Sequence, residues 1–157
     1  TLTSASGLTA LSGCASIHSL PSAAAEVDFN PTTEGRTGWS KYEEVARFNG
    51  VDQRTAYLAA KSGLADAGFS IKRASFDDGM VAGEHGMTAY DWNIVAAVYI
   101  RESDHGSDVK ILVEGSKDVG LWGDMTAESW PQKILKGMRE YIATESSISN
   151  PSQKLFE

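Results

Sequence analysis

The sequence predicts an α+β fold, a two-layer sandwich in which an antiparallel four-stranded meander sheet has two helices packed on one face. An amphipathic helical pattern precedes a run of strand patterns, and a second helical pattern follows that run. The links between the strand patterns are short. Short links join antiparallel neighbours, and helices at both ends of the run can cover the same face of a sheet.

The chain is long enough for one domain with its own core. It has 157 residues, of which 41% are hydrophobic, and two large domains do not fit in that length. Its net charge of −7 argues against nucleic acid as a partner, because neutralising phosphates takes clustered Lys and Arg. The sequence contains no run of about 18 apolar residues, so it predicts no membrane-spanning helix. Its single cysteine excludes an intramolecular disulfide.

The first helix is predicted between Asp52 and Gly68. Asp52 is a good N-cap residue, and Gly68 is a natural residue to follow the helix. The apolar residues between them recur at helical spacing: Ala56, Tyr57, Ala60, Leu64 and Ala67. The segment before this helix, Trp39 to Phe48, fits a helix as well as an edge strand, and the sequence does not decide between them.

Four strands are predicted after this helix. The strand patterns occur at 69–72, 80–85, 92–100 and 109–113. Asp77-Asp78-Gly79 and the segment around Gly106 contain the residues that tight turns prefer. The strands are therefore expected to follow one another in meander order.

The last element is an amphipathic helix predicted from Ser129 to Thr144. Pro131 is tolerated because it falls in the first turn. The apolar stripe of this helix consists of Trp130, Ile134, Leu135, Met138, Tyr141 and Ile142. Such a stripe predicts that this helix also packs on the sheet.

The two faces of the predicted sheet differ less in polarity than a half-exposed sheet normally does. The face expected under the helices carries Trp92, Ile94, Val98, Val109, Ile111 and Val113. The opposite face carries Val95, Ala97, Tyr99 and Leu112 among Lys110 and Glu114. Either the Trp39 to Phe48 segment or another loop covers this second face, or it contacts a partner or a second copy. Val95, Tyr99 and Leu112 are therefore candidate partner contacts.

A further candidate contact lies in the long connection before the last helix. Leu121 and Trp122 form a large apolar pair in a segment that is otherwise typical of a surface loop. This pair either caps the edge of the core or binds a partner.

The first 25 residues contain no Asp, Glu, Lys or Arg. Within them, Leu11-Ser12-Gly13-Cys14 resembles the lipobox of bacterial lipoproteins, in which a small residue precedes a cysteine that accepts a diacylglyceryl group. The alternative is an ordinary buried cysteine. The resemblance implies that residues 1–13 are a truncated signal peptide and that Cys14 carries the lipid. In Gram-negative lipoproteins an Asp after the cysteine favours the inner membrane, so Ala15 implies the outer membrane, with the protein on its periplasmic side.

The rest of the chain is expected to fall into three parts. Residues 14–38 are rich in Ser, Ala, Thr, Pro and Gly, which predicts a lipidated flexible tether. Residues 39–144 hold the α+β domain. Residues 145–157 have the composition of a disordered tail.

Three short motifs resemble those of small uncharacterised lipoproteins of Gram-negative bacteria. They are Gly83-Glu84-His85-Gly86-Met87, Asp91-Trp92 leading into Val98-Tyr99, and Ser129-Trp130-Pro131-Gln132-Lys133-Ile134. The resemblance covers roughly Gln53 to Ile142 and implies the same order of helix, four strands and helix. It implies no activity and no catalytic residue.

The candidate catalytic and metal-binding residues do not converge. Glu84 and His85 would point to opposite faces of a strand, and His105 falls in a turn. Asp77 and Asp78 are explained by turn chemistry rather than by acid–base catalysis. The sequence therefore predicts no enzyme, no metal ion and no cofactor.

The expected function is that of a lipid-anchored, non-enzymatic domain facing the periplasm. Its partners would be the membrane, through the N-terminal lipid, and an envelope protein or a second copy. The alternative is a small-molecule binding module with a pocket between the helices and the sheet, near Trp92 and Trp130.

Overall fold

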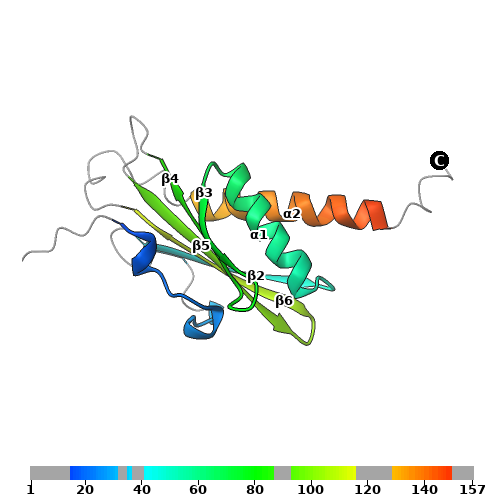
Figure 1. Cartoon of the computed structure of the whole chain (residues 1–157). Coiled ribbons are helices and arrows are strands. Elements are labelled where there is room, and N and C mark those ends of the chain that lie inside the picture. The colour runs from blue at the N-terminus through cyan, green and yellow to red at the C-terminus, as the bar shows by residue number, and fades with distance from the viewer. Residues whose placement is uncertain (1–14, 32–34, 37–40, 87–92, 116–128, 150–157) are drawn as a thin grey trace, which may run out of the picture.

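The computed structural model describes residues 15–31, 35–36, 41–86, 93–115 and 129–149. Figure 1 shows two helices on one face of a twisted sheet. The elements in chain order are η1 (Ile17–Ser19), η2 (Ala24–Glu26), β1 (Gly35–Arg36), β2 (Lys41–Asn49), α1 (Gln53–Asp66), β3 (Ser70–Ser75), β4 (Met80–His85), β5 (Ile94–Ser103), β6 (Gly106–Glu114) and α2 (Ser129–Ser149). The predicted α+β class is confirmed.

The sheet has more strands than the sequence predicts. Its strand order is β1-β2-β6-β5-β4-β3, and all neighbours are antiparallel. The four predicted strands are β3 to β6, and they form the expected meander. The ambiguous segment becomes β2, which pairs along its whole length with β6, from Lys41 opposite Glu114 to Asn49 opposite Gly106. The two-residue β1 completes that edge, so the prediction of four strands is wrong.

The turn and cap signals of the sequence act as expected. The side chain of Asp52 accepts a hydrogen bond from the Thr55 amide at 2.6 Å, which caps the first turn of α1. Gly68 and Gly79 have φ values of 90° and 61°, a backbone conformation that residues with a Cβ rarely adopt. Gly79 thereby closes the hairpin that joins β3 to β4.

One face of the sheet forms the main core with the helices, as the alternation predicts. Ile94, Val98, Val109, Ile111 and Val113 are buried there, whereas Trp92 lies outside the described residues. The helices contribute Ala56, Ala59, Ala60, Leu64, Trp130, Ile134, Leu135 and Met138. Burying a large apolar side chain contributes about 1.5–3 kcal/mol, so this cluster is the main source of stability.

The second helix continues beyond the predicted boundary at Thr144. It ends at Ser149, so residues 145–149 are helical and the prediction of a disordered tail is wrong there. The hydroxyls of Thr144, Ser146 and Ser149 each donate to the carbonyl four residues earlier, so these polar side chains find their partners within the helix. Residues 150–157 lie outside the described part of the chain.

The two helices approach closely where each has a glycine. A Cβ placed on Gly63 of α1 would lie 2.5 Å from the carbonyl oxygen of Ile134 and 2.8 Å from a side-chain carbon of Met138. A Cβ on Gly137 of α2 would lie 2.8 Å from the Cα of Gly63. The helix pair therefore requires a residue without a side chain at this crossing.

The variant Gly63→Ala is expected to lower the free energy of unfolding by about 1–3 kcal/mol, although Ala is the better helix former. The added methyl group meets the backbone of α2 and pushes the helices apart. Chemical denaturation measures the effect, with Ser62→Ala on the same helix as the matched control. Equal stability of the two variants would show that the helices do not depend on contact at Gly63.

Candidate functional site: the strapped face of the sheet

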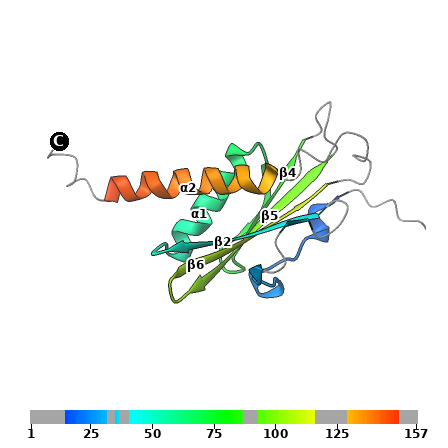
Figure 2. The ribbon, with the colours of Figure 1, turned by 180° about the vertical axis from the view of Figure 1, so that it is seen from behind.

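The second face of the sheet is covered by the chain's own N-terminal segment. We call Ala15–Phe29 the strap. Figures 1 and 2 show this segment, in blue, on the side of the sheet opposite to the helices. Its apolar side chains pack against Met80, Ala82, Val95, Ala97 and Tyr99, with Leu112 at the margin. These six residues define the strapped face.

The strap runs along β5 and is fastened at several points. The carbonyl of Ala15 accepts a hydrogen bond of 2.7 Å from the side chain of Asn93, just before β5. The Tyr99 hydroxyl donates to the Pro21 carbonyl at 2.7 Å. The Phe29 ring lies 4.4 Å from the guanidinium carbon of Arg101, towards the other end of the strand. The strap therefore follows β5 from its first residues to its last ones.

Apolar burial provides most of the contact between the strap and the sheet. Ile17, Leu20 and Phe29 are 5%, 5% and 7% exposed. Each buried side chain of this size contributes about 1.5–3 kcal/mol before the entropy of ordering the segment is subtracted. The expectation of a flexible tether is thus wrong for Ala15–Phe29, because these apolar residues bind the second face of the sheet.

The predicted partner contacts on this face are corrected by the same observation. Val95 and Tyr99 are completely buried beneath the strap, so they offer no surface to a partner. Leu112 is partly buried and borders a cavity. Leu121, Trp122 and Cys14 lie outside the described residues.

A cavity of about 230 Å³ lies between the second half of the strap and strands β2 and β6. Its lining is partly apolar and partly charged: Pro21, Val27 and Leu112, with Glu26, Asp28, Glu43 and Lys110. The predicted pocket, between the helices and the sheet near Trp92 and Trp130, is on the other side of the sheet, and Trp92 lies outside the described residues. Trp130 itself is 6% exposed, and that side is closely packed where the helices meet at Gly63.

Two of the residues that line this cavity form an ion pair. The Lys110 ammonium lies 2.7 Å from a carboxylate oxygen of Glu43, and the side chains are 2% and 24% exposed. Lys110 stands opposite Tyr99 on β5, and Glu43 comes from the neighbouring strand β2. The charge on Lys110 is compatible with burial because the carboxylate of β2 accompanies it.

Burial raises the pKa of Tyr99, and the nearby carboxylates of Glu114 and Glu26 add to this effect against the opposing Arg73. The phenol is therefore protonated over the whole physiological range. A protonated hydroxyl is what the hydrogen bond to Pro21 requires. Tyr99 thus acts as a fixed fastener for the strap rather than as an acid or a base.

A second charged cluster lies near the hairpin between β5 and β6. Asp108 accepts hydrogen bonds from Arg47 at 3.2 Å and from Arg101 at 3.0 Å. Burial by itself would raise the pKa of Asp108, but the hydrogen bonds from Arg101 and Arg47 outweigh it and hold the pKa below its ordinary value. This cluster ties β2, β6 and β5 together across the sheet.

An aromatic cluster lies at the opposite end of the sheet, beside the start of α2. The His85 and Trp130 rings are 4.6 Å apart, and Phe69 packs edge-on against both. The Lys133 ammonium lies 4.3 Å from the centre of the Trp130 ring. The indole N–H of Trp130 is buried without an acceptor among the described residues.

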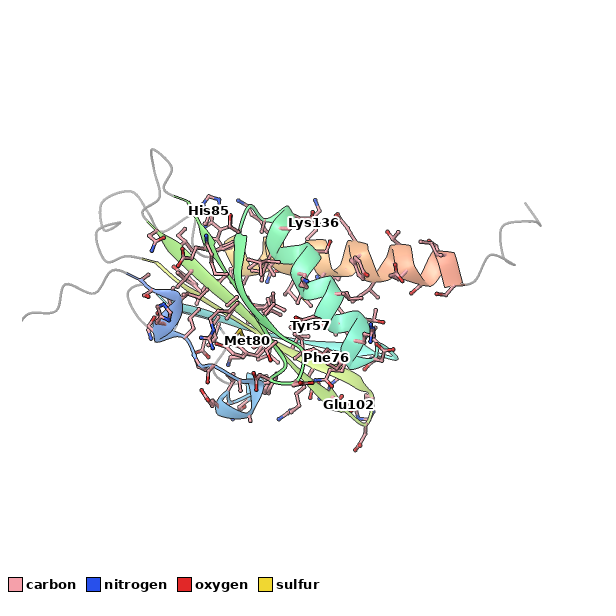
Figure 3. All side chains as sticks on the ribbon, viewed as in Figure 1. Tyr57, Phe76, Met80, His85, Glu102 and Lys136 are labelled. Carbon is pink, nitrogen blue, oxygen red and sulfur yellow. The ribbon has the colours of Figure 1, made fainter. Side chains whose placement is uncertain are left out.

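His85 and His105 lie far apart. His85 ends β4 opposite Ile94, whereas His105 is in the turn after Ser103, so the length of β5 separates them. Figure 3 shows the corresponding ends of the sheet through the labelled His85 and Glu102. Among the residues that the structure describes, no three His, Cys, Asp or Glu side chains form a group suited to a metal ion. In the same residues no helix is long and apolar enough to cross a membrane.

The strap and the Lys110–Glu43 pair escaped prediction from sequence. The available signal was the presence of Ile17, Leu20, Val27 and Phe29 in a segment otherwise typical of a tether. These residues follow neither helical nor strand spacing, so no periodicity points to the surface that they cover.

The variant Glu43→Gln is expected to lower the free energy of unfolding by about 1–3 kcal/mol, because the buried Lys110 ammonium loses its charged partner. The matched control is Glu44→Gln. Glu44 accepts a hydrogen bond from Gln132 in an exposed position, so its loss costs less. Denaturant titration measures the free energy of unfolding of both variants. Equal decreases in the two variants would contradict the role given to the pair of Lys110 and Glu43.

Asp108 is expected to make the protein more sensitive to acid. Its pKa is lower in the folded than in the unfolded chain, so its stabilising effect is complete above the unfolded value. That effect disappears as the pH falls below about 4 and through the folded pKa. Between about pH 5 and pH 2, Asp108→Asn should therefore lose less stability than the parent. Thermal unfolding against pH tests this, with Asp104→Asn in the exposed turn as the control; parallel curves for parent and Asp108→Asn would refute it.

Comparison with known proteins shows no family for this chain. No protein-family model matches the sequence, and no curated protein matches it. Solved structures with some similarity include a protein from Chromobacterium violaceum, with 16% identity and a TM-score of 0.36, covering 63% of this chain and 94% of that one. Another is a protein from Rhodobacter sphaeroides, with 10% identity and a TM-score of 0.37, covering 70% of this chain and 97% of that one. Scores this low support no statement about fold or function.

Proposed function

We propose that the protein is a lipid-anchored, non-enzymatic domain of the bacterial cell envelope, attached through Cys14 to the outer membrane and facing the periplasm. The observation that carries the proposal is the sequence Leu11-Ser12-Gly13-Cys14 directly before the strap. A small residue before the cysteine suits a signal peptidase, and a thiol suits acylation. Several acyl chains at one residue give a lasting anchor, since each buried CH₂ contributes about 0.8 kcal/mol.

The polar groups of the described residues support a structural rather than a catalytic role. Asp108 is held between two arginines, and Lys110 is paired with Glu43. Asp78, a candidate acid or base in the sequence, accepts a hydrogen bond of 2.7 Å from the Ser75 hydroxyl within its turn. Each of these groups has a stabilising partner that accounts for its position. Enzymatic activity is therefore not part of the proposal.

The partner surface in this proposal differs from the predicted sheet face. Val95 and Tyr99 are covered by the strap, so a contact with an envelope protein has to use other residues. Leu121 and Trp122 keep the role proposed from sequence, as a large apolar pair between β6 and α2. Capture of envelope partners by the parent but not by Trp122→Ala would support that role.

A second candidate function is small-molecule binding, and the cavity beneath the strap favours it. Its volume of about 230 Å³ lies below the roughly 300–1,000 Å³ of typical ligand pockets. Only a small ligand therefore fits. Three carboxylates and one ammonium in the lining favour a ligand that carries positive charge.

Cys14→Ala is expected to abolish incorporation of a fatty-acid analogue and to move the protein from the membrane fraction to the soluble fraction. The physical reason is the loss of the thiol that forms the thioether to the lipid. Metabolic labelling followed by membrane flotation measures both effects. The matched control is His18→Ala, an exposed strap position, which should remain labelled and membrane-bound. Labelling of Cys14→Ala at the parental level would disprove the lipid anchor.

A further inference from the structure

The strap determines where an N-terminal anchor can be relative to the domain. The antiparallel register places Lys41, His85, Ile94 and Glu114 together at one end of the sheet. We call this the entry end, and the end with the hairpin turns after Ser75 and Ser103 the turn end. Asn93, which holds the carbonyl of Ala15, lies at the entry end. The strap thus starts at the entry end and leads away from it.

The start of the strap is fixed rather than merely nearby. Ala15 and Ile17 are 8% and 5% exposed. The Ser19 hydroxyl of η1 donates its proton between the Ser16 carbonyl at 2.6 Å and the carboxylate of Glu114, the last residue of β6, at 3.1 Å. Ala15 follows Cys14 directly in the sequence and is itself fastened to the sheet. The docked strap therefore leaves no length of chain between an acylated Cys14 and the entry end.

We propose that the docked strap sets the domain upright on the bilayer, with the entry end against the phospholipid headgroups and the turn end pointing away from the membrane. This inference rests on the proposed lipid anchor and adds the surface that meets the lipid. The acyl chains of residue 14 enter the membrane, and the fastened residues after it bring the entry end to the headgroup layer.

The side chains of the entry end suit a headgroup layer. Trp130 is buried there, whereas Lys133, whose ammonium lies over the Trp130 ring, is exposed, and lysine is a residue that proteins place at membrane interfaces. Lys41 adds a second ammonium whose side chain is 56% exposed although it pairs with Glu114. The turn end exposes both signs of charge, with Glu102 and Asp104 beside Arg47 and Arg101. The exposed lysines of the entry end thus favour the same orientation as the strap.

Release of the strap would change the distance between the entry end of the sheet and the membrane by a measurable amount. The 15 residues from Ala15 to Phe29 span about 50 Å when fully extended. A released strap is therefore a tether that lets either end of the sheet approach or leave the membrane. In the docked state, the ten residues of β5 separate the two ends by about 34 Å.

Energy transfer to the membrane surface tests the orientation. The acylated protein is purified from bacterial membranes and reconstituted into vesicles of phosphatidylethanolamine and phosphatidylglycerol that contain a headgroup-labelled acceptor lipid. A donor fluorophore is attached at Gly86→Cys at the entry end or at Asp104→Cys at the turn end. Both positions are exposed, and a Cβ at Gly86 meets nothing within 4 Å. Because the thiol of Cys14 is consumed by the lipid, the introduced cysteine is the only thiol of the chain.

The expected result is energy transfer from position 86 that is about twofold or more stronger than from position 104, because the length of β5 separates them. Equal transfer from both positions would overturn the orientation, whether it is strong because the domain lies flat or weak because the strap is extended. Failure of the unlabelled parent to bind vesicles would instead overturn the lipid anchor itself. The two failures are therefore distinguishable.

A strap variant supplies the second arm of the test. Leu20→Asp places a charge in the buried contact between the strap and the sheet, and it should reduce the difference between the two labels to nothing by releasing the strap. The matched control, Leu58→Asp, changes an exposed leucine of α1 and should keep the difference. Circular dichroism confirms that both variants are folded. A difference that survives in folded Leu20→Asp would show that the strap does not set the orientation.

Discussion

The structure depends on covering both faces of β5. Every residue from Ile94 to Ile100 is buried, so this strand has no solvated side although its sheet is antiparallel. The helices cover one face and the strap covers the other. A sheet with helices alone would expose the apolar strapped face to water, at a cost of about 25 cal/mol for each Å². The N-terminal segment is therefore part of the folded domain and not an addition to it.

The need to cover this face also explains the polar groups found within it. Tyr99 and Lys110 stand opposite each other on β5 and β6, and both side chains are almost completely buried. The Tyr99 hydroxyl donates to the Pro21 carbonyl on the strap, and the Lys110 ammonium pairs with Glu43 on the neighbouring strand β2. A buried donor without a partner costs about 1–3 kcal/mol, so the hydrogen bond from Tyr99 to Pro21 selects one position of the strap. Apolar contact alone would allow the strap to slide.

The strap also links the proposed anchor to the shape of the domain. A tether of the predicted kind would separate the domain from the membrane and leave its orientation free. A fastened segment does the opposite, because the chain is fixed to the sheet at Ala15, the residue directly after Cys14. The proposed function thus changes in character, from a domain held at a distance to one that stands directly on the lipid surface.

Local patterns in the sequence were sufficient for most of the secondary structure. The cap at Asp52, the turn at Gly79 and the alternation along β5 each depend on residues close together in the chain, and each appears as predicted. The boundary of α2 was missed because serine favours caps and turns over helix interiors, whereas Ser146 and Ser149 are helical here and donate to the carbonyl one turn earlier.

Tertiary structure alone decided what covers the second face and which charges meet. The strap joins Ser19 to Glu114 across 95 positions, and β2 brings Glu43 to Lys110 across the sheet. Neither contact produces a periodic pattern in the sequence, because each joins residues that are far apart in the chain. The composition of the N-terminal segment therefore predicts a flexible tether. The segment is instead ordered, because its apolar residues are buried against the apolar face of β5.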